Sequence, residues 1–169
     1  MSEDLSIDRR LFREAMSRLG AAVNVITTAS EEGDLGFTAS AVCSVTDDPP
    51  TLLVCMNRTG KLNTAFKAAG RLCVNVLSHE QEALSALFAG GDMPMAARFA
   101  RAGWTRLATG APVLDAAAAS FDCKIDQITE VGTHSVFFCT VAAIRLGDAS
   151  TGLIYHGRAY HKIVGADAA

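Results

Sequence analysis

The chain has 169 residues, half of them hydrophobic and a fifth charged, and its formal net charge is −3. A chain of this length is typical of one domain with a sizeable core, so we expect residues 1–169 to form a single domain. Its mild acidity and its lack of basic clusters argue against a nucleic-acid partner. No apolar run is long enough to span a membrane, and the acidic first residues do not resemble a signal peptide, which predicts a cytoplasmic protein without a membrane partner.

A helix is predicted over residues 8–19, ending at Gly20. Its apolar face comprises Leu11, Ala15, Met16 and Leu19. The β-formers of residues 22–28 predict a strand, and the polar turn 31–34 joins it to the next strand as a β-hairpin.

The predicted strand 36–46 has two different faces. Its small or apolar face carries Phe37, Ala39, Ala41, Cys43 and Val45. Its other face carries Thr38, Ser40, Val42, Ser44 and Thr46, of which four have hydroxyl groups. The hydroxyl face fits either a strand facing solvent or a wall of short hydrogen-bonding groups, and the residues alone favour neither.

The loop Asn57 to Lys61 follows a predicted apolar strand over 51–56 and enters a helix that ends at Gly70. The loop contains Gly60 and two cations, Arg58 and Lys61. Backbone N–H groups at a helix N-terminus bind phosphate well, and nearby cations add to this. An ordinary solvated loop remains the other interpretation.

The second half of the chain is read as a series of strands with helices inserted between them. Strands are predicted over 72–77, 121–126, 135–144 and 153–155, and helices after the capping box Ser78/Gln81 and from Pro94. The strand 135–144 is apolar on both faces, which predicts burial on both sides and a subunit interface. Because strands follow one another in hairpin-like groups, the pattern favours a mainly β, antiparallel sheet closed into a barrel with flanking helices.

Several chemical signatures are missing from the sequence. It has no dinucleotide-binding glycine motif, no P-loop and no nucleophile elbow. The five cysteines are widely spaced without a CxxC pair, and the four histidines lack zinc-ligand spacing to any of them, so we expect reduced core thiols and no metal. His134 follows Gly132 and Thr133, where it either faces a pocket or ends a strand.

Three stretches together resemble the flavin reductase family of the FMN-binding split barrel. They are residues 36–57 (GFTASAVCSVTDDPPTLLVCMN), residues 72–77 (LCVNVL), and residues 131–134 (VGTH) with 153–161 (LIYHGRAYH). The likeness extends over about residues 10 to 163. Two branches of the family match about equally: the reductase component of 4-hydroxyphenylacetate 3-monooxygenase and the flavin reductase of pyrimidine utilisation.

The resemblance implies a fold and an activity. The fold is an antiparallel, six-stranded split β-barrel that forms a homodimer. The activity is hydride transfer from NADH or NADPH to FMN or FAD, which supplies diffusible reduced flavin to a separate monooxygenase. A flavin-binding barrel of the same fold without turnover, acting as a sensor or store, is the alternative.

The resemblance also implies a set of site residues. The isoalloxazine would lie along Thr38, Ala39, Ser40, Ala41, Ser44 and Val45. The flavin phosphate would bind at Asn57, Thr59, Gly60 and Lys61, with Arg158 near a phosphate. His134 and Tyr160 would lie on the nicotinamide side, and His134 is the predicted catalytic residue, which positions and polarises rather than acting as an obligate base.

Overall fold

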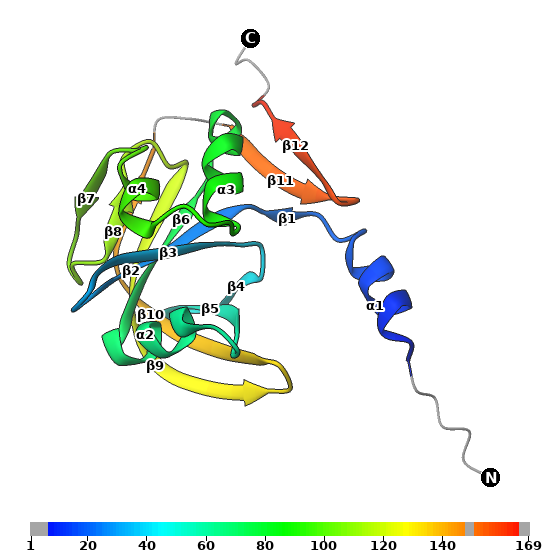
Figure 1. The fold of residues 1–169 in the computed structure, drawn as a ribbon, viewed down its shortest axis with the longest axis horizontal. Coiled ribbons are helices and arrows are strands. Elements are labelled where there is room, and N and C mark those ends of the chain that lie inside the picture. The colour runs from blue at the N-terminus through cyan, green and yellow to red at the C-terminus, as the bar shows by residue number, and fades with distance from the viewer. Residues whose placement is uncertain (1–6, 148–150, 166–169) are drawn as a thin grey trace.

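The computed structural model describes residues 7–147 and 151–165, and it is mainly β with short helices (Figure 1). Its main sheet is antiparallel throughout, with seven strands in the order β3-β2-β6-β9-β10-β5-β4. These strands are β2 (Asn24–Ser30), β3 (Gly33–Ala39), β4 (Val42–Asp47), β5 (Pro50–Asn57), β6 (Arg71–Val76), β9 (Ala119–Val131) and β10 (His134–Leu146). The mainly β, antiparallel prediction is therefore confirmed.

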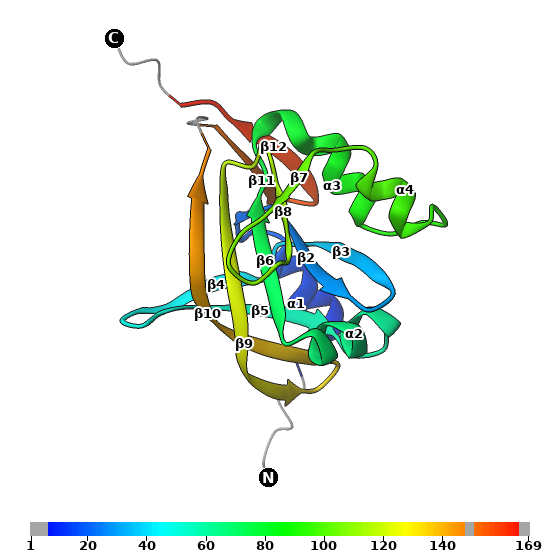
Figure 2. The same ribbon diagram turned by 90° about the vertical axis from the view of Figure 1, so that its left-hand side faces the viewer.

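The sheet curls because its two edge strands are joined by only two residues. β3 and β4 lie at opposite edges, yet β3 ends at Ala39 and β4 begins at Val42. So short a link spans only about 10 Å, so the two edges must approach each other there. The long strands β9 and β10 bend along their length (Figure 2), and two register shifts in their pairing are of the kind that increases local bending.

Two predictions about these strands are wrong. The sequence predicts one strand over 36–46, whereas the structure interrupts it at Ser40 and Ala41; this break gives the sheet seven strands instead of six. The strand 135–144 is predicted to be buried on both faces, whereas within one chain Ser135, Phe137 and Cys139 are buried and Val136 and Phe138 between them are only partly covered.

Two smaller sheets flank the main one. β1 (Ala21–Ala22), β11 (Gly152–His156) and β12 (Ala159–Ile163) form the first, and β7 (Trp104–Arg106) with β8 (Pro112–Leu114) forms the second. The sequence predicted the strand at 153–155 but missed β7 and β8, which are too short to show a periodic pattern.

The helices are short, and the first of them ends at Met16 instead of the predicted Leu19. They are α1 (Arg9–Met16), α2 (Lys61–Ala69), the 3₁₀ turn η1 (His79–Gln81), α3 (Glu82–Phe88) and α4 (Met95–Phe99). α2 ends as predicted at Gly70, which adopts the left-handed conformation. The predicted capping box at Ser78 and Gln81 is present, but it opens the 3₁₀ turn that leads into α3. Within the described ranges, no helix is both long and apolar enough to cross a membrane.

The core has two main parts, one inside the curl of the sheet and one under α3 and α4. Phe66 from α2 is fully buried inside the curl, where it meets the edge of the Phe37 ring at 5.4 Å between centroids. On the other side, Phe88 of α3 contacts the rings of Phe99 and Trp104. β3 is therefore packed on both faces, which fixes its position in the fold.

A buried amide joins four segments behind the sheet. Asn75 on β6 is fully buried, and its Nδ2 donates to the carbonyl oxygen of Val25 (3.1 Å) and to Thr27 Oγ1 (3.2 Å). Its Oδ1 accepts from Leu114 N (2.8 Å) and from Ser120 Oγ (3.0 Å). A buried polar group is stable only when its partners are present, so this side chain locks β8 and β9 against β2.

Replacing this amide should destabilise the fold. Asn75→Ala leaves several buried groups without partners, so the free energy of unfolding should fall by about 3 kcal/mol. Urea unfolding at a fixed protein concentration measures the change. Gln127→Ala on the exposed part of β9 is the control, and it should change the value by less than about 0.5 kcal/mol. Equal effects of the two substitutions would contradict this role of Asn75.

Candidate functional site

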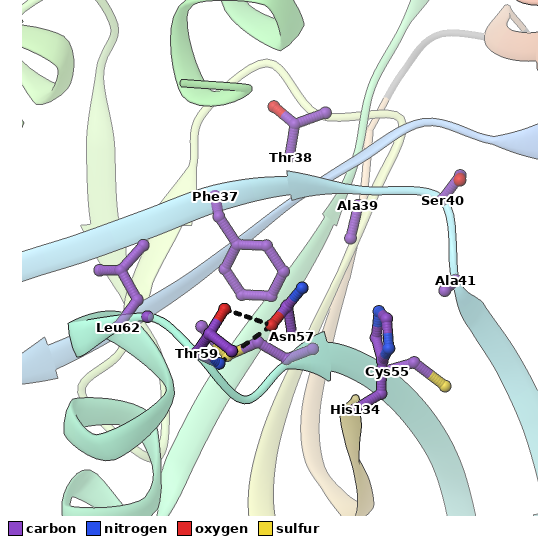
Figure 3. Close-up of a pocket in the computed structure, with 12 residues that line it drawn as sticks. Phe37, Thr38, Ala39, Ser40, Ala41, Cys55, Asn57, Thr59, Leu62 and His134 are labelled. Carbon is purple, nitrogen blue, oxygen red and sulfur yellow. Dashed lines mark hydrogen bonds between the residues drawn. The ribbon is translucent and has the colours of Figure 1, made fainter. Parts of the chain in front are cut away.

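A pocket of about 410 Å³ opens where the curled edges of the sheet meet. Its walls come from the end of β3, the link to β4, the end of β5, the loop before α2 and the start of β10 (Figure 3). The lining residues are Phe37, Thr38, Ala39, Ser40, Ala41, Cys55, Met56, Asn57, Thr59, Gly60, Leu62 and His134. The volume is in the range of small-molecule and cofactor sites.

The wall formed by β3 and its link presents small side chains and backbone. Ala39 points toward the centre of the pocket, whereas Thr38 points to the opposite side of the strand (Figure 3). The Thr38 hydroxyl donates to the carbonyl oxygen of Ser85 on α3 at 2.6 Å. Because Ala39 and Ala41 have only a methyl group, a flat ring could approach the main chain closely at this wall.

The loop after β5 is stabilised by an internal turn. Asn57 Oδ1 accepts from the Thr59 backbone N–H at 2.9 Å and from Thr59 Oγ1 at 2.7 Å. Gly60 then caps α2 without any side-chain hydrogen bond to the first turn. The N–H groups that begin α2 therefore lie beside the pocket, where a helix N-terminus favours an anion such as phosphate.

His134 stands at the mouth of the pocket as the first residue of β10. It is exposed, it pairs with Asn57 across the β5–β10 ladder, and its Nδ1 lies 2.9 Å from Thr133 Oγ1. A neutral imidazole that accepts the Thr133 proton at Nδ1 carries its own hydrogen on Nε2. His134 could then donate a hydrogen bond to a molecule in the pocket.

The pocket brings together eight of the residues predicted from the sequence. They are Thr38, Ala39, Ser40, Ala41, Asn57, Thr59, Gly60 and His134. Three stretches that are far apart in the chain therefore meet at one place.

The other predicted residues lie elsewhere in this chain. Ser44 lines a second hollow of about 330 Å³, Val45 is exposed, and Lys61 lines a groove between α2 and the β2–β3 turn. Arg158 Nη1 pairs with Glu14 Oε2 of α1 at 2.8 Å, and the Tyr160 hydroxyl lies 2.7 Å from Ser85 Oγ.

The sequence interpretation missed the apolar floor of the pocket. Phe37, Met56 and Leu62 line it, and so does Cys55, whose pKa is raised by burial so that it stays a thiol at neutral pH. These residues read as core in the sequence, because an apolar floor and an apolar core have the same alternation. Among the described residues, no group of three or more His, Cys, Asp or Glu side chains could hold a metal ion.

The fold and pocket agree with a known family of domains. Residues 16–164 match the model of the flavin reductase like domain, which is most of the chain. The chain therefore belongs to the flavin reductase like family.

Individual relatives match along nearly the whole chain. FMN reductase (NADH) RutF of Variovorax paradoxus strain S110 is 59% identical over 152 residues, which cover 90% of this chain and 84% of that protein. A crystal structure described as a candidate flavin reductase from Haemophilus somnus 129PT has a TM-score of 0.90 at 44% identity and covers 93% of this chain and 100% of its own. The styrene monooxygenase flavin reductase of Pseudomonas putida S12 has a TM-score of 0.81 at 28% identity, over 92% and 98%.

Proposed function

We propose that this chain is an NADH-dependent FMN reductase that supplies diffusible reduced flavin to a separate flavin-dependent monooxygenase. The observation that carries the proposal is the pocket wall of Ala39 and Ala41, which faces the helix start at Gly60 and has His134 at its mouth. This arrangement fits a planar ring with a phosphate tail. The name of the Variovorax relative supports FMN and NADH as cofactors, and the styrene monooxygenase reductase supports service to an oxygenase.

The family relation supports more detailed assignments. We place the chain in the pyrimidine-utilisation branch, since the Variovorax relative carries the name RutF. The match over residues 16–164 supports one functional domain over the whole chain. Five free cysteines suit a reducing compartment, which supports action in the cytoplasm.

In the proposed mechanism, the pocket residues would hold a flavin, which when bound would supply the chemistry of hydride transfer from a reduced nicotinamide. Such a transfer needs no protein nucleophile, and much of its rate comes from holding the two rings in a reactive geometry. The wall at Ala39 and Ala41 would support one face of the flavin, while backbone groups of this wall would hydrogen-bond its polar edge. His134, at the mouth of the pocket, would orient and polarise the reacting groups on the nicotinamide side. The start of α2 at Gly60 would hold the phosphate.

We also propose that two copies of the chain assemble into a homodimer. α1 stands apart from the sheet (Figure 1), and no residue of it is buried. Its apolar side chains Leu11, Phe12 and Met16 are 64%, 57% and 46% exposed, respectively. Such an uncovered apolar stripe on a small protein is typical of a subunit interface.

The activity and the pocket can be tested together. The protein should oxidise NADH when FMN is added, which the absorbance at 340 nm follows. Ala39→Leu puts a larger side chain into the pocket, so FMN affinity measured by fluorescence quenching should fall at least about tenfold. Ala68→Leu on the exposed face of α2 is the control and should leave it unchanged. Flavin quenching without NADH oxidation by the wild type would favour a sensor or storage protein instead.

The role of His134 has a separate test. Loss of one neutral hydrogen bond, worth about 1.4 kcal/mol, predicts that His134→Ala slows hydride transfer or raises the KM for NADH about tenfold. Stopped-flow and steady-state measurements with NADH and NADPH report both quantities. His161→Ala on the exposed strand β12 should have no effect. The role is wrong if neither quantity changes in His134→Ala.

The assembly is tested by sedimentation velocity. The wild type should sediment with twice the mass of one chain at micromolar concentration. Phe12→Glu with Met16→Glu places two charges on the apolar stripe of α1, which should shift the protein to the monomer because burying an unpaired charge is costly. A wild type that sediments as a single chain would rule out the proposed dimer.

A further inference from the structure

A carboxylate beside the pocket collects partners from three different segments. Glu130, near the end of β9, lies with Oε2 at 2.8 Å from Arg58 Nε and with Oε1 at 2.6 Å from Lys67 Nζ. Both carboxylate oxygens also accept from Ser135 Oγ, at 2.9 and 3.1 Å. Asn63 Nδ2 of α2 donates to the same Ser135 hydroxyl at 3.0 Å. These five side chains are called the Glu130 cluster below.

Each partner in the Glu130 cluster belongs to a segment that forms the proposed flavin site. Arg58 lies in the loop between Asn57 and Gly60, both of which line the pocket. Lys67 and Asn63 lie on α2, whose N-terminus would hold the phosphate. Ser135 is buried and directly follows His134. Glu130 therefore contacts three of the segments that border the pocket: the loop after β5, α2 and the start of β10. It does not contact the wall formed by β3.

Arg58 adds two further links between the same segments. Its backbone N–H donates to the carbonyl oxygen of Thr133 at 3.0 Å, and its Nη1 donates to that of Gly132 at 3.1 Å. Gly132 adopts a positive φ of 53°, which forms the tight turn between β9 and β10. The turn that precedes His134 is thus tied directly to the loop that follows Asn57.

The charges of the cluster reinforce this geometry. The hydrogen bond from Lys67 is the largest of the effects that lower the pKa of Glu130, so the carboxylate is ionised at neutral pH. The side chains of Glu130, Lys67 and Arg58 are 37%, 34% and 47% exposed. Ion pairs this exposed add little to global stability, so their effect should be seen in the position of the loop and not in the melting temperature.

We propose that Glu130 is a positioning residue that holds the Asn57–Lys61 loop at a fixed separation from His134. Glu130 would thereby fix the distance between the phosphate end of the pocket and its nicotinamide side. Glu130 itself would contact neither cofactor. This inference rests on the proposed function, because it takes the pocket as the flavin site.

The test is the KM for FMN compared with kcat and with the melting temperature. Glu130→Gln keeps the shape of the side chain and removes its charge, so we expect the KM for FMN to rise about fivefold, while kcat stays within about twofold. Asp34→Asn is the matched control, since Asp34 pairs with Arg106 at 2.6 Å with comparable exposure and lies near the start of β3, away from the pocket. The control should change the melting temperature as little as Glu130→Gln does, and it should leave the KM for FMN unchanged.

A second variant covers the case in which Glu130→Gln folds poorly. Lys67→Met removes one cation of the cluster and should raise the KM for FMN in the same direction, and the double variant should show less than the product of the two effects. An unchanged KM in Glu130→Gln and Lys67→Met, or a change matched by Asp34→Asn, would overturn the inference. If Ala39→Leu weakens FMN binding in the same assay while these variants do not, only the role of Glu130 is lost. If Ala39→Leu is also without effect, the pocket assignment fails and this inference fails with it.

Discussion

The two-residue link at Ser40 and Ala41 joins strands at opposite edges of a seven-stranded sheet, and the pocket depends on this connection. A link this short forces the sheet to curl, since its ends cannot separate by more than about 10 Å. Where the strand is interrupted at Ser40 and Ala41, its main chain borders the pocket, and the Ala41 carbonyl oxygen still accepts from the Cys55 backbone N–H at 3.0 Å. Small side chains at this point keep the main chain accessible to a flat ligand, which is how the fold and the chemistry of a flavin reductase meet.

The pocket wall is held from both faces of β3. α3 packs against β3, and the Thr38 hydroxyl is engaged by the Ser85 carbonyl, while Phe66 supports the other side. The open face is left with methyl groups, backbone and a few polar atoms. Such a surface can orient a ring without many strong contacts, which suits a protein whose reduced flavin must leave to reach another enzyme. The family membership and the geometry therefore both favour a reductase that releases its reduced flavin.

Much of the local structure and part of the site could be predicted from the sequence. The hairpin at residues 31–34 and the helix end at Gly70 follow from turn and cap chemistry, which acts over a few residues. The pocket residues Thr38 to Ala41, Asn57, Thr59, Gly60 and His134 were proposed through the resemblance, and the structure places them around one pocket. The strand break at Ser40 was missed, because hydrophobic alternation continues across it and only the curl of the sheet reveals it.

The sequence by itself determined most of the longer strands and helices, and it contained the motifs that mark the family. Only the tertiary structure decided where long side chains end: Lys61 lines a separate groove, Arg158 pairs with Glu14, and Tyr160 meets Ser85. It also revealed the ion pair of Glu130 with Arg58, which lies 72 residues earlier in the chain. Periodicity and capping are set by near neighbours, whereas such contacts depend on how distant strands pair and curl, and no local pattern records that.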